Sequence, residues 1–283
     1  LALLATTCLA GAMLAPQTAS ANPEGATVKH GDINITRNGD KLTIKQGSQR
    51  AVINWQKFSI DKGEITQFLQ NSKSSAVLNR VVSNLPSKIA GELTANGKIY
   101  LVNPNGIVFG KGARVNANSV IASTLNISDS DFMDGGDMQF QGTSRAAIVN
   151  LGEIHADQGD VFMIATRIRN DGAIHAPEGT AGLAAGTDVY LSPQVNDGKR
   201  IVVKANGLKD ALENADAIDN DGMIKAARAE LAAREGTLYD RAINNTGSID
   251  ATGVETGPDG RIRLTSNSGT VRNAGRLQAR EAD

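Results

Sequence analysis

A seven-residue pattern, Asn-x-Gly-x-Ile-x-Ala, returns along the second half of the chain and constrains its fold more than any other feature. Clear copies begin at Asn150, Asn170, Asn220, Asn245 and Asn273. A degenerate copy begins at Asn196, and with it the successive asparagines are 20, 26, 24, 25 and 28 residues apart. A period of that size is typical of a solenoid, in which each repeat forms one coil and buries its apolar side chains against its neighbours.

The chemistry of the pattern predicts how each coil is built. Glycine adopts the positive φ that other residues resist, so Asn-x-Gly predicts a turn. The residues after the turn alternate, which sends the isoleucine and alanine side chains to one face of a strand. If coils stack at a spacing of about 4.8 Å, the isoleucines form an internal ladder and the asparagines an external amide ladder. The internal ladder would consist of Ile154, Ile174, Ile224, Ile249 and Leu277.

The composition agrees with many short strands joined by tight turns. Glycine accounts for 30 of 283 residues, above the usual share of about 7%, and only 4% of the residues are aromatic. The alternation recurs at Leu42 and Ile44 and again at Ile262 and Leu264. We therefore expect an all-β chain that forms a right-handed parallel β-helix, the hand following the usual crossover rule, with small extra-helical strands or hairpins near the N-terminus.

Two segments have a helical composition instead. Residues Leu208–Ala217 are expected to form a short helix or a loop that leaves the solenoid. Residues Ala226–Arg234 lie where the period requires a strand, so we expect packing to override their helical propensity.

The N-terminal segment has the features of a secretory signal peptide. Residues 1–15 are almost wholly apolar or small, Pro16 ends that run, and Ala19 and Ala21 form an A-x-A cleavage site before Asn22. The apolar run is shorter than the roughly 20 residues that a membrane-spanning helix needs. Because no initiator Met and no basic residue precede Lys29, we expect the true N-terminus to lie upstream.

Cleavage at this site would also remove Cys8, the only cysteine of the sequence. A mature chain without cysteine cannot be cross-linked in an oxidising periplasm, and it has no thiol nucleophile or thiolate ligand. The 29 basic and 30 acidic residues nearly balance, so nothing suggests a nucleic-acid partner.

A tight turn is predicted between two apolar strands. It consists of Asn103, Pro104, Asn105, Gly106 and Ile107. Asparagine suits the first position because its side chain bonds the backbone two residues on, and proline presets φ at the second. Asparagine tolerates the third position and glycine suits the fourth, which makes the segment a candidate type I turn.

The surrounding segments, taken in order, resemble the haemagglutination-activity domain of two-partner-secretion (TPS) exoproteins. The segment 52–60 resembles the I-N-W-x-x-F-x-I element of that family, and the resemblance runs from about Gly31 to Asp131. Further matching segments are 67–70, 75–81, 103–110, 115–124 and 122–129. Some members carry an upstream Asn-Pro-Asn-Leu motif, but residues 77–81 hold no proline, which is similar to the high-molecular-weight adhesin branch rather than the filamentous-haemagglutinin branch.

The resemblance implies a secretion and folding-nucleus module at the N-terminus of a large bacterial exoprotein. After export by the Sec machinery, the chain would dock in the periplasm on an outer-membrane β-barrel transporter with POTRA domains, thread through the barrel and fold at the cell surface. Residues 103–107 would serve recognition or nucleation. The implied division is a signal peptide at 1–21, a TPS domain at 22–145 and further β-helix repeats at 146–283. The rest of the exoprotein could be an adhesin, a haemolysin, a haem scavenger or a toxin, and it would carry the binding sites for host-cell or bacterial surface ligands.

Candidate reactive side chains are few. His155 and His175 occupy equivalent repeat positions, but two imidazoles without a third ligand make a poor zinc site. The acidic residues Asp129, Asp131, Asp134 and Asp137 miss the spacing of a calcium loop, so we expect a solvated acidic loop. No G-x-S-x-G, H-E-x-x-H or P-loop motif occurs. We therefore predict no catalytic residue, no metal site and no cofactor.

Two other classes of protein also fit a secreted β-helix. A secreted β-helical polysaccharide lyase or hydrolase would need carboxylates and basic residues that converge on one face, but the repeat places His, Lys, Asp and Gln after the isoleucine without a common chemistry. An autotransporter passenger would require a C-terminal barrel of its own, and none is visible before Asp283.

The cleavage site leads to a first prediction. N-terminal sequencing of the secreted protein is expected to begin at Asn22, because small residues stand at both required positions before it. A secreted protein that keeps the segment beginning at Leu1 would contradict the signal-peptide interpretation.

Overall fold

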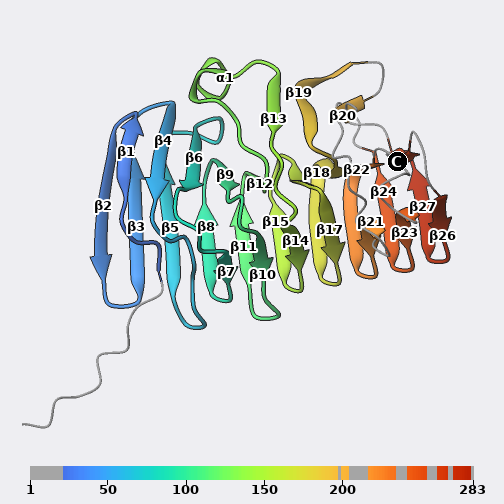
Figure 1. The fold of residues 1–283 in the computed structure, drawn as a ribbon, viewed down its shortest axis with the longest axis horizontal. Helices are drawn as coiled ribbons and strands as arrows, with labels where there is room; N and C mark the ends of the chain where they lie inside the picture. The colour runs from blue at the N-terminus through green and yellow to red at the C-terminus, as the bar shows by residue number, and fades with distance from the viewer. Residues whose placement is uncertain are drawn as a thin grey trace, which may run out of the picture.

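The strands of the chain stack one after another along a single axis in the computed structural model (Figure 1). The structure describes residues 22–196, 199–203, 216–233, 241–253, 260–266 and 270–281. The predicted signal segment lies outside the described residues. So does most of Leu208–Ala217, of which only Asp216 and Ala217 are described, in a strand. In the described part of the chain no helix has the length and apolar character that a membrane span requires.

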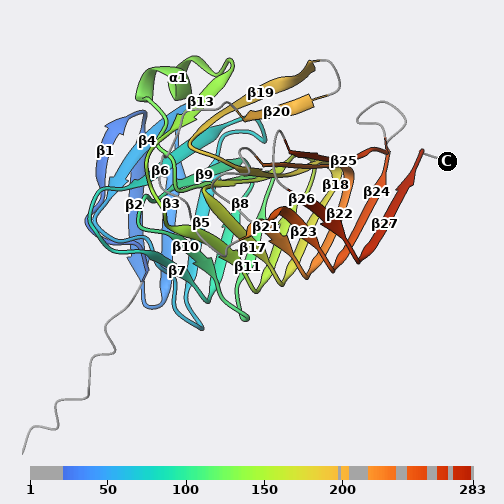
Figure 2. The same ribbon diagram turned by 45° about the vertical axis from the view of Figure 1, so that its right-hand side comes forward.

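Each complete turn of the solenoid contributes one strand to each of three faces, and neighbouring strands within a face run parallel (Figure 2). The first face contains β7 (Ser87–Ile89), β10 (Ile107–Phe109), β14 (Ala147–Asn150), β17 (Arg167–Asn170), β21 (Asp216–Asn220), β23 (Arg241–Asn245) and β26 (Thr270–Asn273). The second contains β3 (Lys41–Gln46), β5 (Ile65–Gln70), β8 (Glu92–Ala95), β11 (Arg114–Ala117), β15 (Glu153–Ala156), β24 (Ser248–Thr252) and β27 (Arg276–Arg280). The third contains β4 (Arg50–Trp55), β6 (Ala76–Val81), β9 (Lys98–Val102), β12 (Ser119–Ser123), β16 (Val161–Ala165) and β25 (Ile262–Ser266). Strands β18 (Ala173–Ala185) and β22 (Met223–Ala233) bend from the second face into the third. The predicted parallel β-helix is therefore confirmed.

Two antiparallel strands cover the N-terminal end of this stack. Strand β1 (Thr27–His30) pairs with β4, and β2 (Ile33–Asn38) pairs with β3. The buried side chain of Asn22 anchors the start of the described chain, donating from Nδ2 to Asp40 O over 2.8 Å and accepting from Thr66 Oγ1 over 2.7 Å. The predicted first residue of the mature protein is thus held within the cap.

Further elements leave the solenoid in the middle of the chain and lie along its third face. They are helix α1 (Asp129–Asp134) and an antiparallel sheet of β13 (Met138–Gln141), β19 (Asp188–Asn196) and β20 (Lys199–Val203). Phe132 of α1 packs edge-on against Tyr100 with ring centroids 5.1 Å apart. Because apolar residues of these elements cover the outer side of the third face, β12 and β16 are buried on both sides.

The hairpin of β19 and β20 corrects the repeat count. Asn196 pairs with Lys199 at the end of that hairpin, so the degenerate copy at Asn196 is not a coil, and its prediction was wrong. The interval between Asn170 and Asn220 instead holds one coil and an insertion. Because the insertion is about as long as one coil, the spacing between asparagines does not distinguish it from an additional coil.

The isoleucines of the repeat lie in register across the second face. Ile154 pairs with Ile174, which pairs with Ile224, which in turn pairs with Ile249, and all four side chains are fully buried. Leu277 continues this register opposite Ile249 but is 40% exposed, because no described coil lies beyond it.

The asparagines of the repeat also stack, but inside the molecule. The Nδ2 of each residue donates to the Oδ1 of the next at 2.6–2.8 Å along Asn150, Asn170, Asn220, Asn245 and Asn273. The first four are fully buried, so the prediction of an external ladder was wrong in its placement. An amide offers both a donor and an acceptor, which lets it satisfy both neighbours in a stack that excludes water.

The glycine of the repeat has a different role from the one predicted. The repeat glycines are absent from the glycines with positive φ. A Cβ on Gly172 would instead collide with the carbonyl oxygen of Gly152, and the same collision recurs between Gly222 and Gly172. Those carbonyl oxygens accept hydrogen bonds from the residue after the next coil's glycine, at 2.9 Å. Glycine is required here because two backbones approach closely.

The helical composition of 226–234 is overridden as expected over 226–233, and residue 234 lies outside the described residues. Ala226–Ala233 belong to β22, a strand that pairs with β18 on one side and with β24 and β25 on the other. Its alanines and Leu231 are nearly all buried, so packing on both edges outweighs helical propensity.

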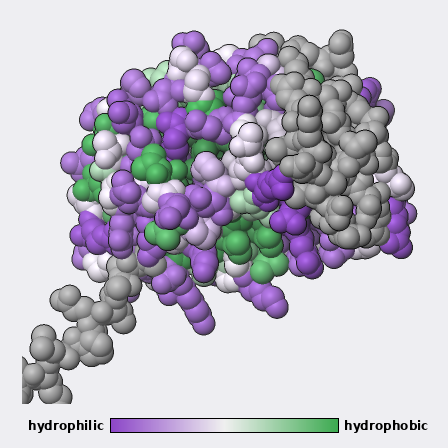
Figure 3. Space-filling model, viewed as in Figure 1, coloured by the Kyte–Doolittle hydropathy of each residue, from purple (hydrophilic) through white to green (hydrophobic). Residues whose placement is uncertain are grey.

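On the face shown in Figure 3, hydrophobic groups form small patches separated by hydrophilic side chains.

The ladder predicts a sharp contrast between two lysine substitutions. Ile224→Lys places a charge among buried aliphatic side chains and is expected to lower the free energy of unfolding by several kcal/mol, about 3 or more. Ser248→Lys, at a partly exposed position beside the same ladder, is expected to cost less than about 1 kcal/mol. Denaturant melts followed by circular dichroism measure both values. Equal tolerance at the two positions, or a helical spectrum, would contradict the fold.

Candidate functional site

The turn at residues 103–107 joins the third face to the first, between β9 and β10. The main-chain N–H of Gly106 donates to Asn103 O over 3.1 Å, which closes the four-residue turn, and Gly106 has a φ of 106°. Pro104 is exposed and Asn105 is half-buried. Asn103 and Ile107 are fully buried, so the turn is fixed to the core at both ends.

The two asparagines of this turn bind the preceding coil. Asn103 Nδ2 donates to Leu85 O and to Ser87 Oγ, both over 2.9 Å. Asn105 Nδ2 donates to Ser83 O over 2.8 Å and to Asn103 Oδ1 over 3.1 Å. Asn103 Oδ1 also accepts from the main-chain N–H of Asn105 over 2.9 Å. The turn therefore holds in place the loop of residues 82–86, which connects β6 to β7.

The 82–86 loop presents apolar side chains to solvent beside this turn. Val82 and Leu85 are each 49% exposed, whereas the residues before and after the loop, Val81 and Ser87, are buried. On the next coil, Ser144 Oγ donates to Pro104 O over 2.6 Å. Three successive coils thus meet at one corner, of which the sequence motif reveals the turn but not the loop that the turn holds.

The upstream segment of the resemblance is also part of this construction. Trp55 Nε1 donates to Asn79 Oδ1 over 2.9 Å, and Asn79 Nδ2 donates to Tyr100 O over 3.3 Å. Both Trp55 and Asn79 are buried. Residues that are far apart in the sequence are therefore linked through stacked coils.

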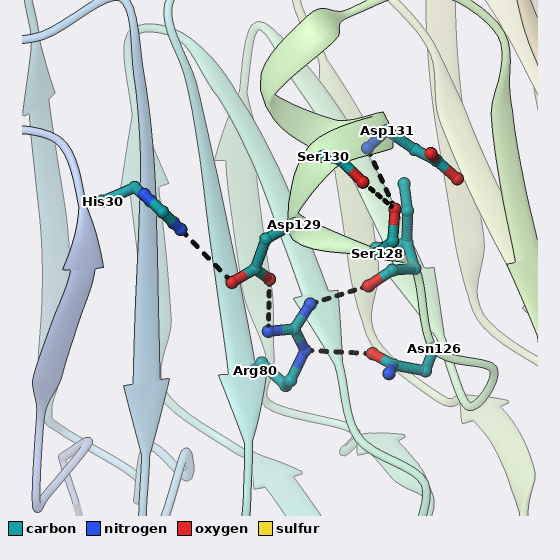
Figure 4. Close-up of polar contacts among 8 residues, drawn as sticks. His30, Arg80, Asn126, Ser128, Asp129, Ser130 and Asp131 are labelled. Carbon is teal, nitrogen blue, oxygen red and sulfur yellow. Dashed lines mark hydrogen bonds and ion pairs between the residues drawn. The ribbon is translucent and has the colours of Figure 1, made fainter.

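Basic residues of the solenoid hold the extra-helical helix α1, a feature that the sequence did not reveal (Figure 4). Arg80 donates to Asn126 Oδ1, Ile127 O and Asp129 Oδ1 at 2.7–2.9 Å. His30 Nε2 of the cap lies 3.5 Å from the other carboxylate oxygen of Asp129. These contacts bring the cap, the third face and α1 together.

The predicted acidic loop is in part this helix. Ser128 caps its N-terminus by accepting from Asp131 N–H, and Gly135 ends it with a φ of 73°. Two aspartates in the first turn favour a helix there because they face the positive end of its dipole. The prediction of a loop was therefore wrong for residues 129–134.

The two repeat histidines lie side by side on the second face. The ring centroids of His155 and His175 are 5.9 Å apart, and His155 Nε2 lies 3.4 Å from Asp157 Oδ1. Burial lowers the pKa of His175, and the neighbouring His155 and Lys225 lower it further. Among the described residues no group of three or more His, Cys, Asp or Glu side chains is arranged to hold a metal ion.

The match to a known family covers nearly the whole stack of coils. The TPS secretion domain family matches residues 19–279. The chain belongs to this family. A TPS domain is the secretion domain of two-partner-secreted exoproteins, so the resemblance seen at residues 31–131 is confirmed, and the match extends well beyond it.

Solved TPS domains have the same architecture. The secretion domain of HMW1 from Haemophilus influenzae is 30% identical, with a TM-score of 0.67, over 92% of this chain and 74% of that one. The filamentous hemagglutinin secretion domain is 17% identical, with a TM-score of 0.64, over 92% of this chain and 99% of that one. The latter likeness is one of fold.

A curated relative is the heme/hemopexin-binding protein of Haemophilus influenzae. It is 30% identical over 223 residues, which cover 75% of this chain and 24% of that protein. A second protein of that name is 43% identical over 88 residues, which are 31% of this chain and 10% of that protein. The TPS chain thus spans about a quarter or less of the curated relatives that it matches.

The corner predicts different costs for the same substitution at its two asparagines. Asn103→Asp would replace an amide donor by a buried carboxylate that faces Leu85 O, and the free energy of unfolding is expected to fall by about 2–4 kcal/mol. Asn105→Asp loses a donor at a half-buried position and is expected to cost about 1 kcal/mol. Denaturant midpoints of the purified variants measure the difference. Equal destabilisation would contradict the assigned hydrogen bonds.

Proposed function

We propose that the corner formed by residues 103–107 and the 82–86 loop is the recognition and nucleation element of this TPS domain. One observation carries the proposal. The side-chain amides of Asn103 and Asn105 donate to the backbone of the preceding coil and so hold its exposed apolar loop in place. Before folding, these segments are separate. After two coils have stacked, they form one surface with Val82 and Leu85 exposed beside Pro104.

The partner in this proposal is an outer-membrane β-barrel transporter with periplasmic POTRA domains. The Sec machinery delivers a largely unfolded chain to the periplasm, where the two coils of the corner form first and an extended segment docks by adding a strand to a POTRA sheet. The remaining chain then threads the barrel, and the stack of coils is completed at the cell surface. The absence of cysteine after residue 21 supports this route, because no disulfide would block passage of the extended chain.

The one-directional stacking of the coils supports templated folding from this domain. The N-terminal end is covered by β1 and β2, and later coils pair in parallel with the coils before them. A further coil can add in the same way, and each added coil buries the previous one. The division into a TPS domain at 22–145 and further repeats at 146–283 remains a prediction. Strands β10 and β14 pair directly across that boundary, so the coils continue from one part into the other.

We further propose that the domain acts as a recognition module and not as an enzyme. The family and the relatives described above are secretion domains and proteins named for heme and hemopexin binding. The effector of the exoprotein, and any host-cell or bacterial surface ligand, is proposed to belong to repeats beyond those described.

The substitution Asn105→Asp tests the role of the corner. It keeps the side-chain volume and the tendency to turn but removes the donor to Ser83 O and adds a charge, so secretion through the transporter is expected to fall at least about tenfold while chain accumulates in the periplasm. The measurement is the amount of protein in the medium and in the periplasm of cells that co-express the transporter.

Asn116→Asp provides the matched control, because Asn116 is exposed on β11 and the change in charge is the same. This variant is expected to be secreted normally. If Asn105→Asp were also secreted normally, Asn105 would be a turn residue without a role in recognition.

A further inference from the structure

The sequence Asn105-Gly106 carries a chemical liability that the folded turn suppresses. Asparagine followed by glycine is prone to spontaneous deamidation, because glycine lacks the side chain that would shield its main-chain nitrogen. Two other Asn-Gly steps lie in the described residues, Asn38-Gly39 and Asn96-Gly97. The chain therefore contains its own comparators.

We propose that Asn105 is a deamidation site whose reactivity is controlled by folding. In the reaction, the main-chain nitrogen of Gly106 attacks Cγ of Asn105, the bond from Cγ to Nδ2 breaks, and ammonia leaves with the amide proton. Water then opens the resulting succinimide at either carbonyl and gives aspartate or isoaspartate. The reaction consumes only water and requires no enzyme.

The folded turn opposes this attack by holding both reacting groups. The nucleophilic nitrogen of Gly106 donates its hydrogen to Asn103 O over 3.1 Å. The amide of Asn105 is held by Ser83 O and by Asn103 Oδ1, the same oxygen that accepts from the main-chain N–H of Asn105. The side chain is therefore turned toward the backbone on its N-terminal side, away from the nitrogen that must attack it.

The other two Asn-Gly steps lie in contrasting environments, one held by hydrogen bonds and one open. Asn96 exchanges two hydrogen bonds of 2.7 Å with the backbone of Gln70, so its amide is also held. Asn38 is exposed at the end of the hairpin of β2 and β3, and no hydrogen bond of its side chain is present in the described structure. A Cβ on Gly39 would meet no atom within 4 Å, so this turn is open. Folding should protect Asn96 and Asn105 but not Asn38.

The product has consequences for the corner. Aspartate at 105 loses the donor to Ser83 O, and isoaspartate inserts a methylene group into the main chain, which prevents the turn from closing. A chain that waits unfolded would thus lose the amide that the corner uses. The link to secretion rests on the proposed function, whereas the protection by folding does not.

The test uses purified chain incubated at neutral pH, either folded or in urea, followed by trypsin digestion and mass spectrometry. The peptides 99–111, 89–98 and 38–41 report on Asn105, Asn96 and Asn38 respectively. In urea the three sites are expected to deamidate at similar rates. In the folded chain Asn105 and Asn96 are expected to react at least about tenfold more slowly than in urea, while Asn38 stays within about twofold of its rate in urea.

The variant Asn103→Ser assigns the protection to the turn. It removes Asn103 Oδ1, one of the two acceptors of the Asn105 amide, and is expected to accelerate deamidation at 105 in the folded chain while Asn96 stays protected. If deamidation accelerates at both Asn105 and Asn96, the variant has unfolded. The comparison of folded and unfolded wild-type chain then decides whether folding protects Asn105. Equal rates for Asn105 with and without urea would overturn the proposal. Because no transporter is present, this result is independent of whether the corner serves recognition.

Discussion

The close approach of backbones at the Asn-x-Gly corner is the constraint on which the C-terminal half of the stack depends. The carbonyl oxygen of Gly152 lies too close to the position that a Cβ of Gly172 would take, and it accepts a hydrogen bond from the N–H of Ala173 over 2.9 Å. The adjacent asparagine amides satisfy one another in the buried interior. A larger residue at the glycine would force the coils apart, and the isoleucines of the second face would lose their register. Register is thus fixed at the corner, and the aliphatic ladder supplies the burial.

This construction makes every coil depend on a neighbour. An isolated coil would expose its isoleucines and leave the asparagine amides without partners, which costs more than the coil gains by itself. The protein solves the problem at one end with antiparallel strands, β1 and β2, and by anchoring Asn22 in the cap. Nucleation of the first coils is therefore the demanding step, and later coils add to a surface that already exists.

The sequence predicted what is periodic and missed what is not. The Ile ladder follows from alternation and period, as does the strand at 226–233, where stacking outweighs helical propensity. The hairpin of β19 and β20 belongs to an insertion of about one coil length, so the spacing makes Asn196 resemble a repeat. The buried position of the asparagines could not be read from sequence, because polar side chains normally face water and only the stack satisfies them. The contacts of Arg80 with α1 and with the residues just before it join positions 46–49 residues apart, and no local pattern encodes them.

The corner at 103–107 differs from the repeat corner in a way that suits recognition. The asparagines of the repeat each bind an equivalent asparagine, so their ladder is uniform and inward-facing. Asn103 and Asn105 instead bind the backbone of a non-equivalent loop, and that loop keeps Val82 and Leu85 at the surface. A uniform ladder gives a partner nothing to distinguish one coil from the next. An irregular corner marks one position along the stack, and it exists only when two specific coils have met. In the proposed function, the same hydrogen bonds would join the first folding event to a surface that identifies the domain.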